Sequence, residues 1–168
     1  KIKKTKMFGV DLMLPVLAQK KESFDIVSYI PPKDWAKSNT AETVTFTKDG
    51  GNQYCVISLC KSIDATADAQ QNFDNSWQVM ATTSLGAGAV TMQPGSTDNG
   101  WETKIGSAPF DKDGLTGSAI LISSSKNNKQ VNILILTNTD AYLKEMEAFL
   151  ESVDLKSPGN ATIVKPSQ

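Results

Sequence analysis

The chain has 168 residues, of which 39% are hydrophobic and 21% charged, and its formal net charge at pH 7 is −1. This length and composition predict a single globular domain whose core needs no disulfide or metal to hold it together. All 17 basic residues are lysine, because the sequence contains neither histidine nor arginine. Histidine-dependent catalysis, histidine zinc sites and bidentate arginine clamps on phosphate or carboxylate are therefore excluded.

The first 22 residues differ from the rest of the chain in charge. They carry a net charge of +4, whereas the remaining residues carry −5, and this mildly acidic body gives no electrostatic reason to bind nucleic acid. A lysine-rich start precedes an apolar run at residues 7–18, which is typical of a secretory signal and too short to span a bilayer. We therefore expect an exported protein, periplasmic or secreted. Because Asp11 interrupts the apolar run, the alternative is an ordinary amphipathic leader or an amphipathic helix packed on the domain.

The region after the leader predicts β-strands. Polar and apolar side chains alternate over residues 24–31 until Pro31 and Pro32 end the strand, because proline has no N–H to donate. Residues 42–63 predict two strands joined at residues 49–51, an Asp-Gly-Gly sequence that is a strong hairpin signal.

A helix is predicted over residues 66–85, capped by Asp64 or Thr66 and ended by Gly86. Its apolar stripe consists of side chains three or four residues apart: Phe73, Trp77, Met80 and Ala81. Four further strands follow, at residues 89–93, 100–106, 115–125 and 131–138, and the last of these is expected to be central and buried on both sides.

The closing helix is predicted over residues 141–153, with Asp140 as its cap. Its buried stripe consists of Leu143, Met146, Leu150 and Val153, widened by Phe149. Strands separated by single helices and joined by hairpin turns predict an α+β fold with a twisted antiparallel sheet of about six to seven strands, covered by two main helices. We assign residues 1–22 to a leader, 23–156 to one domain and 157–168 to a tail.

Several short motifs resemble catalytic or binding signatures but are better explained as structure. Ser-x-x-Lys occurs twice, at residues 58–61 and 123–126, on strand ends where its two side chains point to opposite faces. Cys55 and Cys60 share one predicted strand, about 16 Å apart, which is too far for a disulfide. The acidic turn at residues 111–114 lacks the first and last ligands of a calcium loop. We therefore expect no catalytic residue, no cofactor and no metal site.

The candidate binding residues are mainly aromatic. Trp77 is assigned to the core, because it lies on the apolar stripe of the first helix. Trp35 and Trp101 begin strands or follow turns, so they either plug the edges of the core or line a binding surface. Together with Tyr54 and Asp98 they form the predicted partner or ligand surface.

The order of these elements resembles the PsbP/Mog1-like fold. Residues 24–35, Phe-Asp-Ile-Val-Ser-Tyr-Ile-Pro-Pro-Lys-Asp-Trp, are similar to the opening pattern of that family, with Asp34 in place of the usual glycine before the tryptophan. The Asn-Gly-Trp turn at residues 99–101 and the closing pattern Phe149, Ser152 and Leu155 also fit, so that the resemblance covers about residues 24–155. It implies a twisted antiparallel sheet with helices on its faces, as in small exported bacterial members of the family. It also implies action by docking on other proteins.

Three functions remain open. The first is a non-catalytic exported domain that docks on a protein partner or a cell-envelope component. The second is a small-ligand-binding domain that uses a cleft between sheet and helix with Trp35 and Trp101. The third is a hydrolase that works without histidine and depends on paired carboxylates, lysine, serine or cysteine. We expect the first, with no enzymatic activity, no nucleic-acid partner and no transmembrane segment; the sequence does not specify the oligomeric state.

Overall fold

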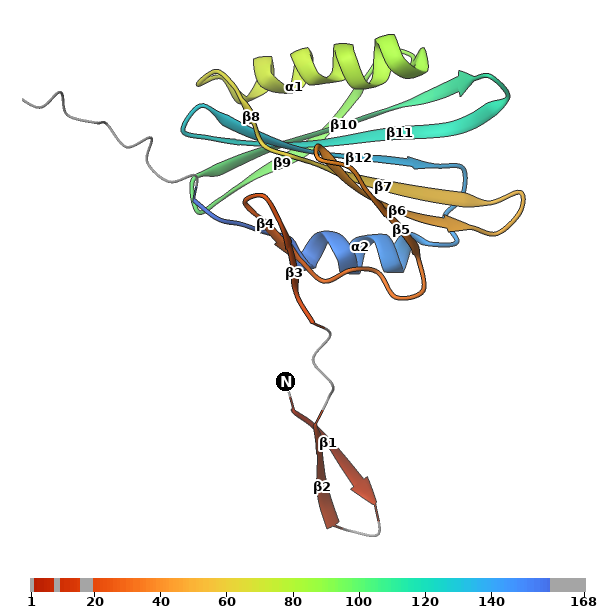
Figure 1. The fold of residues 1–168 in the computed structure, drawn as a ribbon, viewed down its shortest axis with the longest axis vertical. Coiled ribbons are helices and arrows are strands. Elements are labelled where there is room, and N and C mark those ends of the chain that lie inside the picture. The colour runs from red at the N-terminus through yellow and green to blue at the C-terminus, as the bar shows by residue number, and fades with distance from the viewer. Residues whose placement is uncertain (1, 8–9, 16–19, 158–168) are drawn as a thin grey trace, which may run out of the picture.

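The structure, a computed structural model, describes residues 2–7, 10–15 and 20–157 of the chain (Figure 1). Its first strands, β1 (Ile2–Met7) and β2 (Val10–Pro15), pair antiparallel as a hairpin. The amphipathic helix considered for the leader is therefore wrong for these two segments. The physical reason lies in the pattern, because residues 4–7 alternate with a period of two and Pro15 lacks the N–H that a helix needs.

The main sheet is antiparallel, with the spatial order β5-β6-β7-β12-β11-β10-β9, and β8 pairs with the start of β12. Its strands are β5 (Ala36–Asn39), β6 (Thr43–Asp49), β7 (Tyr54–Cys60), β8 (Ile63–Asp64), β9 (Thr91–Asp98), β10 (Trp101–Lys112), β11 (Leu115–Lys126) and β12 (Lys129–Thr137). The predicted α+β class and antiparallel sheet are confirmed. The main sheet has eight strands, more than the six to seven expected. The strands β5 and β8 were not predicted, because they are only four and two residues long and leave no readable alternation in the sequence.

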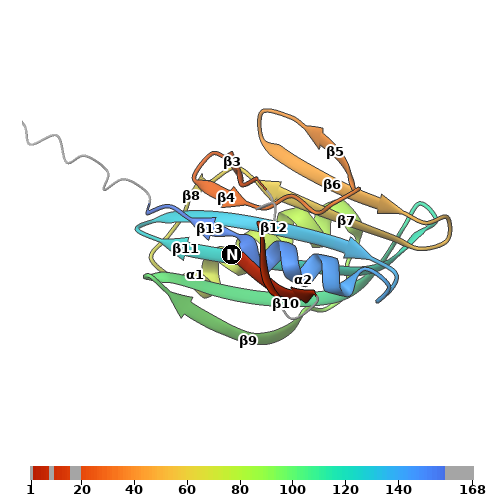
Figure 2. The ribbon, with the colours of Figure 1, turned by 90° about the horizontal axis from the view of Figure 1, so that it is seen from below.

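One helix covers each face of this sheet (Figures 1 and 2). On one face, α1 (Ala69–Trp77) continues into a π-helical segment, η1 (Gln78–Thr83), and contacts β10 and β11. On the opposite face, α2 (Leu143–Ser152) lies beside a small antiparallel sheet with the order β13-β4-β3. The strands of the small sheet are β3 (Glu22–Phe24), β4 (Val27–Tyr29) and β13 (Asp154–Leu155).

Strand β12 is buried on both sides, as predicted, and joins two core clusters. The cluster under α2 is centred on three aromatic rings whose centroids lie 5.6 to 5.7 Å apart: Tyr29, Phe46 and Phe149. The cluster under α1 contains Phe73 and Trp77, stacked with centroids 5.9 Å apart. The core assignment of Trp77 is thus confirmed.

The predicted first strand, residues 24–31, is a hairpin rather than one strand. β3 ends at Phe24 and β4 begins at Val27. Between them Asp25 has a φ of 53°, and its Oδ2 accepts a hydrogen bond from the Ser62 N–H at 2.9 Å, which fixes the turn. The alternation could not reveal this turn, because both arms of the hairpin keep a period of two.

The cap of α1 is Asp68, not Asp64 or Thr66 as predicted. The Asp68 Oδ1 accepts a hydrogen bond from the Gln71 N–H at 3.1 Å, so the helix begins three residues later than the expected range. Thr66 instead donates both its N–H and its hydroxyl to Asn72 Oδ1, each at 2.8 Å. The predicted end is confirmed, because the helical stretch ends at Leu85, immediately before Gly86.

α2 also begins later than predicted, at Leu143, and its N-cap residue Tyr142 makes no side-chain capping bond. Asp140, the predicted cap, contributes its backbone carbonyl, which accepts from the Leu143 N–H at 3.2 Å. The first turn is therefore secured by the preceding loop rather than by a carboxylate.

The Pro-Pro-Lys-Asp-Trp segment leads from β4 to β5 and anchors on α2. Trp35 is buried; its Nε1 donates to Glu145, and its ring meets that of Tyr142 edge-on at 6.0 Å between centroids. Asp34 has a φ of 64°, in the left-handed region that glycine adopts most readily and that aspartate tolerates. This explains how Asp34 can occupy the position at which the resembled pattern has glycine.

Strand β9 forms one edge of the main sheet and all its residues are exposed. The register shifts between Thr103 and Ile105 of β10, because Pro94 and Gly95 together oppose one residue, Lys104. A Cβ on Gly95 would lie 2.3 Å from the Thr103 carbonyl oxygen, so the bulge requires glycine.

We predict that Gly106→Ala destabilises the protein. A Cβ at this position on β10 would lie 2.5 Å from Phe73 Cζ and 2.6 Å from Val90 Cγ2, beneath α1. Overpacking of this kind costs about 1–3 kcal/mol, measurable by urea denaturation. Gly88→Ala is the control, because its added Cβ would have nothing nearer than 3.8 Å. Equal stability of the two variants would contradict this account of the packing.

Candidate functional site: a cleft between the sheet and α2

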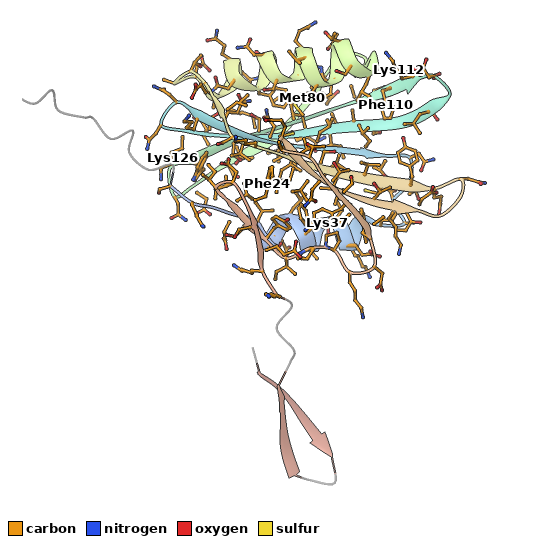
Figure 3. The ribbon with its side chains drawn as sticks, in the orientation of Figure 1. Phe24, Lys37, Met80, Phe110, Lys112 and Lys126 are labelled. Carbon is orange, nitrogen blue, oxygen red and sulfur yellow. The ribbon has the colours of Figure 1, made fainter. Side chains whose placement is uncertain are left out.

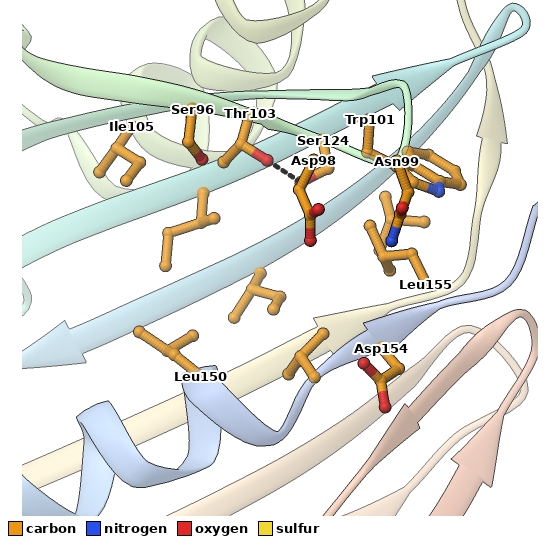
Figure 4. A pocket seen from close by; sticks show the side chains of 14 residues that line it. Ser96, Asp98, Asn99, Trp101, Thr103, Ile105, Ser124, Leu150, Asp154 and Leu155 are labelled. Carbon is orange, nitrogen blue, oxygen red and sulfur yellow. Dashed lines mark hydrogen bonds between the residues drawn. The ribbon is translucent and has the colours of Figure 1, made fainter.

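The α2 side of the main sheet is only partly covered, and a cleft of about 370 Å³ lies where the cover ends. Its floor is formed by β10, β11 and β12, and its walls by the C-terminal end of α2, by β13 and by the β9–β10 turn (Figure 4). A cavity of this size lies within the range of small-molecule pockets and also fits one large side chain.

The inner surface of the cleft is apolar. Ile105 and Ile122 face each other across β10 and β11 on the floor, and both remain half-buried. Leu150, Val153 and Leu155 approach from α2 and β13, and they too are half-buried rather than enclosed. These side chains thus present apolar area that the domain itself does not cover.

The rim of the cleft is polar. Thr103 and Ser124 share a hydrogen bond of 2.7 Å at the sheet side (Figure 4). The exposed Asp98 carboxylate lies on the β9–β10 turn, and Asp154 on β13 forms an ion pair of 2.6 Å with Lys21. Such exposed ion pairs contribute little to stability.

Lys126 holds the β9–β10 turn against the end of the domain. Its Nζ donates to the Asn99 carbonyl at 2.6 Å and to the Ser157 hydroxyl at 3.2 Å. The turn itself has left-handed φ values at Asn99 and Gly100, 51° and 81°. The rim is therefore built on a fixed hairpin rather than on a loose loop.

Trp101 lies at the end of the cleft, and its indole N–H is buried without a hydrogen-bond partner among the described residues. The residue is 4% exposed, and its Nε1 is the buried side-chain nitrogen or oxygen for which residues 20–157 provide no hydrogen-bond partner. An unpaired buried N–H costs about 1–3 kcal/mol.

The structure brings two of the four predicted site residues together. Trp101 and Asp98 line the same cleft. Trp35 is enclosed against α2, as described above. Tyr54 lies near the β10–β11 turn, where its hydroxyl donates to the Thr116 carbonyl at 2.7 Å. The four residues therefore do not form one surface.

The main residues that sequence reasoning missed are the apolar walls of the cleft. Leu150 and Val153 were assigned to the buried stripe of the last helix, yet both are only half-buried and line the cleft. The helical period predicts which side of α2 faces the sheet, but it carries no information on how far the sheet extends beyond the helix.

Neither cysteine of the chain is an activated nucleophile. Cys55 and Cys60 are free, and burial raises the pKa of each thiol to about 11. Both therefore stay protonated at neutral pH, which disfavours nucleophilic attack and metal binding by thiolate. Within residues 20–157 no three potential metal ligands among His, Cys, Asp and Glu lie close enough to hold an ion. In the described part of the chain no helix is long and apolar enough to cross a bilayer.

Comparison with known proteins defines the fold. No protein-family model matches the chain, and no curated protein is similar to it in sequence. Among solved structures, it is similar to the solution structure of cyanobacterial PsbP (CyanoP) from Synechocystis sp. PCC 6803. The TM-score is 0.54 at 9% identity, covering 87% of this chain and 98% of that one. The chain therefore has the PsbP/Mog1-like fold that its sequence resembles.

Two further structures are similar. A crystal structure from Bacteroides thetaiotaomicron VPI-5482 matches with a TM-score of 0.55 at 12% identity, covering 85% of this chain but only 50% of that chain. The chain thus spans half the length of that protein. The Saccharomyces cerevisiae Ran-binding protein Mog1p matches with a TM-score of 0.49 at 8% identity, over 82% of this chain and 96% of that chain. At such low identities, the TM-scores of 0.54 and 0.55 to the Synechocystis and Bacteroides structures show a common fold and nothing about activity.

We predict that the free energy of unfolding falls as the pH rises from about 10 to about 12, in part because of Tyr29. Burial, with the nearby Glu22 carboxylate, raises the pKa of Tyr29 from 10.0 to about 12. The stabilisation is complete below the unfolded pKa and is lost as the folded group ionises. Tyr29→Phe should remove about 2–3 kcal/mol of this pH dependence in urea titrations. Identical pH profiles for the variant and the parent protein would contradict the assignment.

Proposed function

We propose that this chain is a non-catalytic binding domain that docks on a protein or cell-envelope partner through the cleft beside Trp101. The supporting observation is the chemistry of that cleft, which is lined by half-buried apolar side chains that the domain itself does not cover and which has Trp101 at its end. An apolar anchor from a partner would complement these side chains. Anchors that fill such pockets supply most of the binding energy at protein interfaces.

The same chemistry supports binding rather than turnover. The sequence provides no imidazole for general acid–base catalysis, and the raised thiol pKa values leave its cysteines unreactive. The polar groups on the rim are hydroxyls, an amide and two exposed carboxylates, without a base next to a nucleophile. These groups can orient a bound surface, and we assign them that task.

The test uses two variants of β9, each with one added arginine, on opposite faces of the strand. Ser96 and Thr97 are adjacent and exposed, but only Ser96 lines the cleft. Immobilised parent protein, Ser96→Arg and Thr97→Arg would be exposed to an envelope fraction of the source organism, and the retained proteins identified by mass spectrometry. We expect a partner that the parent protein and Thr97→Arg retain and Ser96→Arg loses, at least about tenfold in recovered amount. Equal retention by all three would overturn the assignment of the cleft.

A small ligand is the second candidate, favoured by the size of the cleft and by its apolar lining with a polar rim. A metabolite panel that raises the melting temperature of the parent protein and of Thr97→Arg, but not of Ser96→Arg, would favour this alternative. Such a shift follows directly from ligand binding to the folded state.

We also propose that the protein acts outside the cytoplasm. The support is the lysine-rich start followed by the apolar run at residues 7–18. Residues 1–22 fused to a reporter that folds only after export should direct it across the inner membrane of a bacterial host. Replacing Leu12 and Leu14 of the fusion with lysine is the control, because added charge abolishes the apolar run. Reporter activity independent of these replacements would contradict the proposal.

A further inference from the structure

A second hollow lies on the opposite face of the sheet, along the side of α1 and η1. We call it the α1 groove; its volume is about 660 Å³. Its walls include Ile63 and Val79, which are 46% and 64% exposed, and the half-buried Met80. Met80 lies on the α1 side of the sheet, whereas Phe24 and Lys37 lie on the α2 side (Figure 3). The groove is therefore separate from the cleft beside Trp101.

The floor of the α1 groove is a set of buried side-chain amides, which is unusual beneath apolar walls. Gln130 and Asn132 project from the same face of β12 and are only 3% and 4% exposed, and both line the groove. Asn72 and Ser76 of α1 meet them from above and are 2% and 7% exposed. Burying a polar group lowers the stability of the folded state unless the group makes its hydrogen bonds.

Most of these bonds are made within the domain. The Gln130 Nε2 lies 2.9 Å from the Asn72 carbonyl oxygen, 3.0 Å from Asn132 Oδ1 and 2.8 Å from each of the Ser76 and Ser123 hydroxyl oxygens. These four oxygens share the two hydrogens of the Gln130 amide, and the Asn72 carbonyl, which can only accept, places the amide nitrogen on this side. The Asn132 Nδ2 donates to the Ser76 hydroxyl at 3.0 Å. The amide orientations are thus fixed by the network.

Two hydrogen-bonding groups of this amide network have no partner in the described residues. Within residues 20–157, Gln130 Oε1 accepts no hydrogen bond, and Asn132 Nδ2 uses one of its two hydrogens. One acceptor and one donor therefore remain two residues apart on one strand face. An amide group, which itself offers one donor and one acceptor, complements this pair.

The charges around the α1 groove are balanced, which favours a neutral ligand. Asp64 is paired with Lys129, which lies next to Gln130 in the sequence. Glu42 and Lys61 at the rim carry opposite charges, and the Lys61 N–H donates to the Glu42 carbonyl at 2.8 Å. No side of the groove therefore offers an unbalanced charge to an anion or a cation.

We propose that the α1 groove binds a neutral amide carrying a branched apolar group. The amide bonds to Gln130 Oε1 and to Asn132 Nδ2, and the apolar group packs against Ile63, Val79 and Met80. The amide can belong to a small molecule or to the backbone of a peptide, because both present the same donor and acceptor.

The test uses N-acetyl-leucinamide as the probe, added to isotope-labelled full-length protein and followed through the side-chain amide signals of Gln130 and Asn132. We expect saturable shifts of these signals. Methyl 4-methylpentanoate keeps the branched chain and a carbonyl but has no N–H, and we expect it to leave the signals unchanged. N-acetyl-glycyl-leucyl-glycinamide distinguishes the sources: tighter binding assigns the site to peptides, and equal binding to small amides.

Matched variants locate the binding site. Val79→Asp places a charge on the wall of the α1 groove, and Leu115→Asp makes the same change at another exposed apolar residue, on the β10–β11 hairpin. We expect affinity for N-acetyl-leucinamide to fall at least about tenfold in Val79→Asp and to stay within about twofold in Leu115→Asp. Both residues are exposed, and unchanged dispersion of the backbone signals will confirm folding. No shift in the parent protein, equal shifts with the ester, or undiminished binding by Val79→Asp would overturn the proposal.

Discussion

The burial of β12 on both faces is the constraint on which the rest of the structure depends. A central strand with apolar side chains on each side requires a separate cover above and below the sheet, and each face has one main helix. Strands lie about 4.8 Å apart and a helix is about 10 Å wide, so one helix spans roughly two strands. A sheet of this width therefore has uncovered area on each face. The cleft beside Trp101 and the α1 groove lie at the two places where the cover ends.

Most of the fold could be predicted from the sequence because its elements leave strong local signals. Turn residues with left-handed backbone angles, such as Asn99 with Gly100 and Asp113 with Gly114, mark the long hairpins of the sheet. Alternation identified β6, β7 and β12, and the helical period identified α1 and α2. Elements of two to four residues, including β5, β8 and β13, depend on pairing with distant strands and leave no readable pattern.

The candidate sites were harder to predict, for a physical reason. A cleft results from what tertiary packing leaves uncovered, and neither the floor at Ile105 and Ile122 nor the wall at the end of α2 carries a local signal for it. Trp101 was found because a tryptophan after a turn is conspicuous, whereas Trp35 has the same appearance in the sequence and packs against Tyr142, outside the cleft. The amide network beneath α1 has one clue in the sequence, the run of serines at 123–125 opposite Gln130 and Asn132 in the next strand. Only the placement of α1 brings Asn72 and Ser76 onto that polar patch.

The bulge at Pro94 and Gly95 affects how readily the edge of the sheet can associate with another copy of the protein. An exposed edge strand normally presents unpaired backbone N–H and C=O groups with which a strand of another chain can pair, and repeated pairing of this kind leads to fibrils. The bulge interrupts the regular spacing of backbone groups along β9, and Pro94 has no N–H to donate. The interruption disfavours the addition of a further strand along this edge of the sheet.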